Sequence, residues 1–334
     1  MPSSAEPSLK YSRRIKWLGF FVAALIALYT GAWFWGAYYL KQEIGKALSA
    51  STVDGKRADC QNLDIKGYPF RAGVFCDRVA FEDPSQKISV KLGAVRSATQ
   101  IYDPMRGIVE LDGPLELALP GGKSIRAEWS LLHASGRLAQ PLPKRLSLEA
   151  NDVAISLPSQ PLFKAGNIQS HFRTSGQDID LAASGAGIVI DSLAAQGRAI
   201  PEFSFGADLQ IRNGVALATS GEKNLARLLR GQSGTLRAIS LDFADGGGLT
   251  LSGPVSLDEN GLLSGDISIT FSEAEKLGKA IEKAAPEIAA YVSPSLSLAA
   301  ANAKPGEDPR IDVTIRKGRA AIGLIPLGEI PPLQ

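Results

Sequence analysis

The sequence is poor in the side chains that carry most enzyme chemistry. Histidine, cysteine and methionine each occur only twice among its 334 residues. His133 and His171 stand far apart in the chain, and nothing in their spacing places them beside each other or beside carboxylates, as a general base or a metal pair requires. Structural zinc needs four ligands, which two cysteines without a nearby histidine do not supply. We therefore expect no catalytic residue, no metal site and no cofactor.

Catalytic motifs and an excess of one charge are missing as well. The sequence contains no G-x-S-x-G, no Walker loop, no H-E-x-x-H and no Rossmann glycine pattern. Its 36 basic and 34 acidic residues leave a net charge of +2. Nucleic-acid-binding proteins normally present a strongly basic surface, so we expect no nucleic-acid partner. The sequence thus predicts a protein that is not an enzyme.

One long hydrophobic run is present and organises the rest of the chain. It extends from Trp17 to Leu40 without a charged residue, which exceeds the about 20 helical residues that cross a bilayer core. Basic residues outnumber acidic ones just before it, and they are Lys10, Arg13, Arg14 and Lys16. By the positive-inside rule, the N-terminus is expected to stay in the cytoplasm.

A cleaved signal peptide is the alternative to a permanent anchor. Its apolar core normally has 7–15 residues, followed at once by a small-residue cleavage site. Here the run is longer and ends in aromatic residues, and the nearest candidate site, Ala47-Leu48-Ser49, is distant. We expect a cytoplasmic segment 1–16, a transmembrane anchor 17–40, a juxtamembrane helix or linker 41–58, and a periplasmic domain 59–334. The protein is then a single-pass protein of the bacterial inner membrane.

The two cysteines flank one turn. Cys60 and Cys76 stand on either side of Gly67-Tyr68-Pro69-Phe70, with strands expected before and after this turn. An oxidising periplasm allows them to pair, and a bridge of this length would stabilise the fold by about 3 kcal/mol in the chain-entropy model. Two buried free thiols are the alternative, which we consider weaker than the disulfide.

The turn and the C-terminus also support a resemblance. GYPFR (67–71) followed by a cysteine behind an anchor, and the closing segment Gly318–Leu333, resemble the bacterial family catalogued as domain of unknown function 2125. The likeness covers most of the chain beyond the anchor. It implies a β-rich envelope protein facing the periplasm, without an established activity. By architecture alone, the chain also resembles the AsmA-like lipid-transport proteins.

Most of the chain alternates apolar and polar residues, as half-buried strands do. Three such segments, 239–243, 249–257 and 263–271, are separated by Gly246-Gly247-Gly248 and by Asn260-Gly261. They predict an antiparallel meander with one apolar face. Its candidate residues are Ile239, Leu241, Phe243, Leu249, Leu251, Leu263, Ile267 and Ile269. The fold class is mainly β: a single transmembrane helix followed by an extended antiparallel meander with a minority of helices.

Two weaker patterns add detail. Val109–Leu117 and Leu249–Leu257 share a strand, a Gly-Pro bend and a strand in the same phase, from either a duplication into two similar halves or chance. A short helix is expected at 222–230 and a longer one at Ser272–Val292, the latter capped by Ser272 and kinked or divided by Pro286. The apolar stripe of the second helix is expected to pack on the sheet.

The apolar face leads to two hypotheses about function. Such a face must be covered, so the sheet either closes on itself as a sandwich or barrel, or curves into a groove. A groove lined by apolar side chains would suit acyl chains, and the anchor would hold it beside the inner membrane. We therefore predict binding of a lipid or another apolar envelope component. The alternative is a scaffold with a closed core that docks other envelope proteins.

Overall fold

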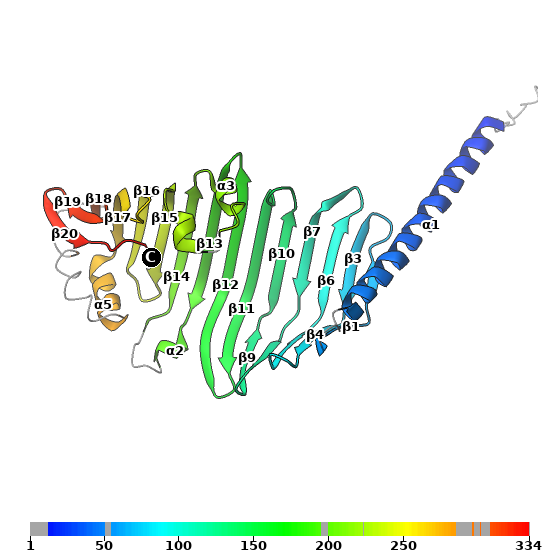
Figure 1. Ribbon diagram of the computed structural model, residues 1–334, viewed down its shortest axis with the longest axis horizontal. Helices are drawn as coiled ribbons and strands as arrows, with labels where there is room; N and C mark the ends of the chain where they lie inside the picture. Colours follow the sequence, from blue (N-terminus) through cyan, green and yellow to red (C-terminus); the bar gives the residue numbers. More distant parts are fainter. Residues whose placement is uncertain are drawn as a thin grey trace, which may run out of the picture.

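The protein is a long helix followed by one large antiparallel sheet. The computed structural model describes residues 13–50, 55–194, 200–222, 224–284 and 308–333, together with Leu296 and Ala301. Within these residues the sheet does not close into a barrel (Figure 1). The predicted fold class is therefore confirmed.

The strands follow the alternation seen in the sequence. The helices are α1 (Arg13–Ala50), α2 (Asp191–Ala194), α3 (Gly214–Ala218), α4 (Leu225–Leu229) and α5 (Ala274–Ala284). The strands are β1 (Arg57–Gln61), β2 (Asp64–Lys66), β3 (Arg71–Cys76), β4 (Arg78–Asp83), β5 (Ile88–Leu92), β6 (Val95–Gln100), β7 (Asp103–Leu111), β8 (Leu115–Leu119), β9 (Lys123–Glu128), β10 (Leu131–Arg137), β11 (Arg145–Leu157), β12 (Gln160–Ser175), β13 (Asp178–Ile188), β14 (Phe203–Ile211), β15 (Ser233–Phe243), β16 (Gly248–Leu257), β17 (Leu263–Ser272), β18 (Arg310–Arg316), β19 (Arg319–Ile322) and β20 (Ile325–Glu329).

The topology is a meander in which strands pair with their neighbours in sequence. From β11 to β20 each strand pairs with the next. In the first half, β3 and β4 pair with β6 and β5, while β7 and β8 pair with β10 and β9. Both β10 and β9 then pair with the single strand β11. The first ten strands thus form five long strands, each interrupted once.

These interruptions form one line across the sheet, which we call the crease. It passes through Asn62, Asp77, Ala94, Asp112, Ser130 and Asp152. Backbone hydrogen bonds continue across it: the Asp77 amide donates to Gln61 O (2.8 Å) and the Asp112 amide to Ala94 O (2.8 Å). The Trp129 indole also donates to a backbone carbonyl there, Leu111 O (2.7 Å). The ladder therefore changes course without leaving these donors unpaired.

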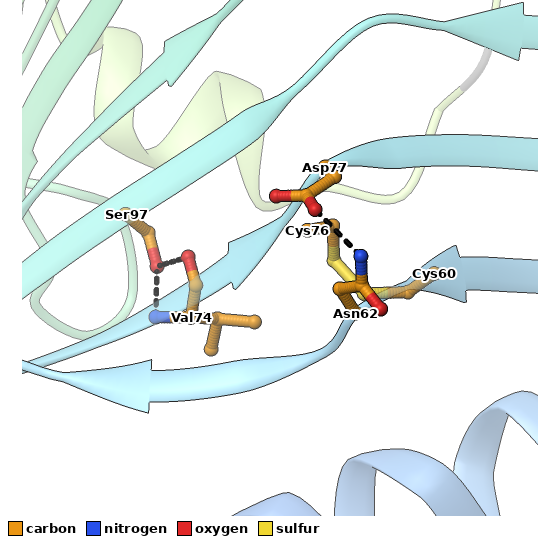
Figure 2. Close-up of a disulfide and its surroundings, with 6 residues drawn as sticks. All are labelled: Cys60, Asn62, Val74, Cys76, Asp77 and Ser97. Atoms are coloured by element: carbon orange, nitrogen blue, oxygen red, sulfur yellow. Dashed lines mark hydrogen bonds between the residues drawn. A yellow bond between two sulfur atoms is a disulfide. The ribbon is translucent and has the colours of Figure 1, made fainter.

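The predicted disulfide is present and closes the crease beside α1. Cys60 in β1 and Cys76 in β3 are bonded, with their Cα atoms 5.3 Å apart (Figure 2). Next to them, Asn62 Nδ2 donates to Asp77 Oδ2 at 2.7 Å. The covalent bond and this hydrogen bond hold together the two strands of the first hairpin where their ladder is interrupted.

One face of the sheet carries apolar side chains from strand to strand. Phe205, Leu241 and Leu249 are successive cross-strand partners on β14, β15 and β16, and Phe271 follows on β17. Helix α5 covers this part of the face, and its Leu277 has no exposed surface. The predicted packing of this helix on the sheet is confirmed.

Both predicted helices begin later than the sequence suggested. Ser272 is the last residue of β17, so the predicted Ser272 cap is wrong, and Glu273 O accepts from the Leu277 amide (3.0 Å) instead. The expected bend at Pro286 lies outside the described residues. The helix expected at 222–230 is shorter in the structure and corresponds to α4. It begins at Leu225 because the side chain of Asn224 caps it by accepting from the Arg227 amide.

The two Gly-Pro segments occupy similar positions in their ladders. Gly113-Pro114 lies between β7 and β8, which pair with the same long strand, while Gly253 lies inside β16 beside an irregularity in its pairing with β15. Gly253 has φ +145°, and a Cβ there would meet Asp266 O at 2.0 Å. These positions do not distinguish an internal duplication from chance, so the division of the domain into two similar halves stays a prediction.

The disulfide is expected to stabilise the sheet next to α1. A Cys60→Ser, Cys76→Ser protein should lose about 3 kcal/mol of unfolding free energy, because a loop of 16 residues is no longer closed in the unfolded chain. Urea unfolding of the full chain in detergent, followed by circular dichroism, measures this loss. Cys60→Ser alone should give the same loss, and an unchanged midpoint in both variants would contradict the stabilising role.

Candidate functional site

Helix α1 touches the sheet through its apolar segment. This helix is long and apolar enough to cross a membrane, and its apolar window is not buried by the rest of the protein. Three hydrogen bonds join it to the turn at residues 67–70 and to the start of β3: Tyr29 Oη to Pro69 O, Thr30 Oγ1 to Tyr68 Oη (2.7 Å), and Trp33 Nε1 to Arg71 O (3.1 Å). The turn is therefore fixed beside the part of α1 that a membrane would surround.

Aromatic rings strengthen this contact. The Tyr68 ring lies 5.5 Å from the Trp33 ring, edge to face, and 5.6 Å from the Phe34 ring, stacked. The turn itself closes with the Arg71 amide donating to Gly67 O (2.9 Å). Gly67 has φ +123°, where a Cβ would lie 2.8 Å from the Arg71 backbone. Of the predicted turn motif, the structure thus gives Tyr68 a docking contact and Gly67 a backbone role.

The turn belongs to one edge of the sheet, which we call the rim. The rim comprises residues 67–70, 101–105, 138–144 and 174–178, which are the connections on this side from β2 to β13 together with the adjoining ends of β7, β12 and β13. Backbone hydrogen bonds link neighbouring connections, as from the Ile101 amide to Phe70 O (3.1 Å) and from the Leu138 amide to Met105 O (2.7 Å). The exposed apolar side chains of the rim are Tyr68, Phe70, Ile101, Tyr102, Met105 and Leu138.

An open hollow lies on the apolar face directly behind the rim. Its volume is about 480 Å³, and we call it the apolar hollow. Its apolar lining includes Met105, Val109, Leu138, Leu146, Leu148 and Phe172. Val109, Ala134 and Leu148 are successive cross-strand partners on β7, β10 and β11. Met105 and Leu138 belong to both the rim and the hollow, so the hollow opens at the rim.

The residues that the sequence singled out lie farther along the same face. Leu241, Phe243, Leu249 and Ile269 pack with α5. Leu251, Leu263 and Ile267 pack with β18 and Ile330. Ile239 is partly buried, between its partners Ala207 and Leu251. The structure therefore brings all eight onto one face, at the end that other parts of the chain cover.

Sequence reasoning did not single out the apolar hollow. Leu146 and Leu148 alternate with polar residues just as the chosen residues do, and they form one strand, β11, with Val153 and Ile155. Alternation assigns each residue to a face, but coverage of that face depends on distant segments. The exposed fractions of 41% for Leu146 and 39% for Leu148 distinguish them from Phe243 at 8%.

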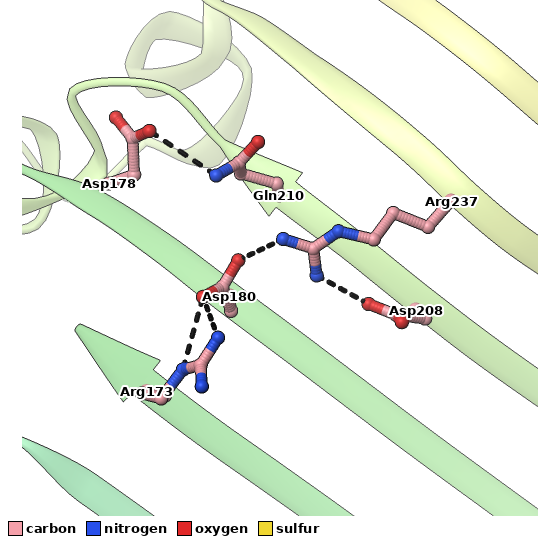
Figure 3. A network of polar contacts seen from close by, with 6 residues as sticks. All are labelled: Arg173, Asp178, Asp180, Asp208, Gln210 and Arg237. Atoms are coloured by element: carbon pink, nitrogen blue, oxygen red, sulfur yellow. Dashed lines mark hydrogen bonds and ion pairs between the residues drawn. The ribbon is translucent and has the colours of Figure 1, made fainter. Parts of the chain in front are cut away.

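The opposite face is polar and carries an ion-pair network. Asp180 on β13 accepts hydrogen bonds from Arg173 (2.8 Å) and from Arg237, and Arg237 also donates to Asp208 (2.8 Å; Figure 3). The Arg173 hydrogen bond, followed by the Arg237 hydrogen bond, lowers the pKa of Asp180. This carboxylate is 8% exposed, so the two guanidinium groups compensate its burial.

The two histidines also lie on this polar face. His171 Nδ1 is 3.0 Å from Ser147 Oγ, and Ser147 is its cross-strand partner. His133 lies opposite Glu110 and Glu149 on neighbouring strands. Strand β11 separates the two histidines. Within the described parts of the chain, no group of three histidine, cysteine or acidic residues could hold a metal ion.

The Asp180 network should make stability depend on acid pH. A lowered folded-state pKa means that the unfolded chain takes up the proton first, so the contribution is full above about pH 4 and is lost as pH falls through the folded value. Asp180→Asn should destabilise the protein at pH 6, and its difference from wild type should shrink by pH 3. Urea midpoints at both pH values measure this. Asp245→Asn, which removes an exposed carboxylate, should show no such convergence.

Comparison with known proteins identifies the family. No curated protein and no solved structure matches the chain. Residues 33–331 match the family described as "Uncharacterized protein conserved in bacteria (DUF2125)". The match begins within α1 and continues past β20, and so includes the turn at residues 67–70, the disulfide and the apolar face. The chain is therefore a member of the DUF2125 family, as its turn and its closing segment suggested.

Proposed function

We propose that this protein binds lipid acyl chains along the apolar face of its sheet and that they enter at the apolar hollow. The observation that carries the proposal is an open apolar hollow of about 480 Å³ directly behind the rim, the edge of the sheet whose turn at residues 67–70 contacts α1. The role is one of binding rather than catalysis, because the hollow is lined by aliphatic and aromatic side chains and by small residues.

The cost of leaving this surface in water supports an apolar occupant. Val109, Leu146 and Leu148 are 36%, 41% and 39% exposed although they lie in the middle of a sheet. Contiguous exposed apolar surface of this kind marks interaction sites in soluble domains. Each methylene group moved from water onto it gains about 0.8 kcal/mol, so a chain of several methylenes would bind measurably.

The face continues beyond the hollow toward α5. Phe172 at the hollow is the cross-strand partner of Leu181 on β13, which in turn lies opposite Leu209 on β14. Farther on, α5 and Ile330 cover the face. An acyl chain entering at the rim would therefore meet an apolar path that ends at a closed core.

The proposed location follows from the anchor and the disulfide. Basic residues precede the apolar segment of α1, which favours a cytoplasmic N-terminus and a periplasmic sheet at the inner membrane. A disulfide in the sheet suits the oxidising periplasm. The protein would take lipid at one membrane and would not act as a free shuttle.

A scaffold is the second candidate function. The terminal hairpin leaves Leu324, Ile325 and Leu327 exposed by 100%, 67% and 53%. Strand β20 pairs with β19 on one side only among the described strands, so its other edge could accept a strand from another envelope protein. Crosslinking at β20 in cells would give a defined protein partner under this candidate.

Lipid binding predicts that polar side chains in the hollow weaken lipid retention. The full-length protein purified in mild detergent should carry lipid, detected by mass spectrometry of the extract. Val109→Gln, Leu148→Gln should lower the affinity for this lipid roughly tenfold, because two amides would lose water to an apolar chain.

The matched control changes the opposite face. Ile108→Gln, Leu131→Gln alters two residues that are 39% and 37% exposed on β7 and β10 but face away from the hollow. It should retain lipid as wild type does. Absence of lipid from the wild-type protein, or equal losses in both variants, would contradict the proposal.

A further inference from the structure

We propose that the rim docks onto the anionic phospholipid headgroups of the membrane that α1 crosses, through a row of arginines next to the rim. The inference rests on α1 as a membrane anchor. It does not depend on the apolar hollow carrying lipid, since it concerns the opposite face of the same strands.

The row consists of directly opposed arginines on four adjacent strands. Arg106 on β7 is the cross-strand partner of Arg137 on β10, which is the partner of Arg145 on β11, and Arg145 is the partner of Arg173 on β12. Like charges directly opposite each other destabilise a sheet. We call these four residues the arginine row.

The protein supplies too few carboxylates to neutralise the row. Asp103 lies 3.9 Å from Arg106 and 3.5 Å from Arg137, so the two share one carboxylate. Arg173 shares Asp180 with Arg237, which lies outside the row. Among the described residues, neither Arg145 nor the neighbouring Lys144 has an ion-pair partner. The row therefore keeps a net positive charge that external anions can neutralise.

A hollow beside the row gives such anions room. It measures about 560 Å³ and is lined by residues of β7, β10, β11 and β12 and by Lys144. All four arginines of the row and Lys144 line it, and no acidic side chain does. Guanidinium groups match phosphate oxygens with two parallel hydrogen bonds, so a phosphodiester is the anion that this geometry suits.

The rim brings the row to the membrane surface. Tyr68 stacks on Phe34 of α1, and the Ile101 amide donates to Phe70 O, so the connections at 67–70 and 101–102 lie beside the apolar part of the anchor. Arg106 follows Tyr102 by four residues and Arg137 immediately precedes Leu138. With exposed aromatic and aliphatic tips at the interface and arginines just behind them, the rim has the pattern of an interfacial anchor.

The occupant is therefore the surface of the membrane in which α1 sits, with its anionic phosphates. Charge complementarity selects anionic over zwitterionic headgroups, because each basic residue near an anionic surface adds to the attraction. Docking would also hold the open side of the apolar hollow against that same surface.

The test compares two bilayers. The full-length protein is reconstituted into nanodiscs of phosphatidylcholine alone or of phosphatidylcholine with phosphatidylglycerol. Hydrogen exchange is then measured at the backbone amides of residues 101–106 and 138–145. We expect slower exchange of both segments with phosphatidylglycerol. Arg137→Gln, Arg145→Gln should abolish most of the difference, since removing two charges lowers the docking equilibrium about thirtyfold.

A charge-matched variant provides the control. Arg78→Gln, Lys123→Gln removes two exposed basic residues far from the rim and should keep the phosphatidylglycerol effect. Unchanged exchange in β15–β17 verifies that both variants are folded. The proposal is overturned by equal rim protection in the two bilayers or by equal losses in both variants. It is also overturned if inorganic phosphate added to phosphatidylcholine discs reproduces the protection, which would make the row a small-anion site.

Discussion

The constraint on which the structure depends is the burial of one continuous apolar face. Alternation along an antiparallel meander puts every second side chain on that face, and the sheet does not close on itself to hide it. At the C-terminal end, α5 and Ile330 cover it. Behind the rim, no described segment covers Val109, Leu146 and Leu148. The difference between these two ends separates the stable core from the candidate site.

The crease lets a long meander stay ordered where its strands are interrupted. Backbone donors at Asp77 and Asp112 find carbonyls across the interruption, and the indole of Trp129 joins them. At the outermost hairpin the ladder has, among the described strands, a partner on one side only, and there the disulfide between Cys60 and Cys76 supplies a covalent link. The sheet is thus reinforced next to α1, the helix that is long and apolar enough to cross a membrane.

The rim lies next to a candidate binding surface on each face of the sheet. On one face it opens into the apolar hollow, and on the other it borders the arginine row. A lipid carries a group that suits each of these surfaces. Its acyl chains suit the apolar hollow, and its phosphate suits the arginine row. The contacts of Tyr68 with Trp33 and Phe34 place this edge of the sheet against the apolar part of α1. Under the two proposals made above, acyl chains and headgroups would be bound at the same edge of the sheet.

The sequence by itself determined the local features: the apolar helix from Trp17, the pairing of Cys60 with Cys76, and the face to which each strand residue belongs. These depend on hydrophobicity, cysteine number and a period of two, which are readable within short segments. Only the tertiary structure decided that Leu241 is covered while Leu148 stays open, and that four arginines distant in the chain stand side by side. Coverage and register depend on pairing between distant segments, for which a single sequence carries no local signal.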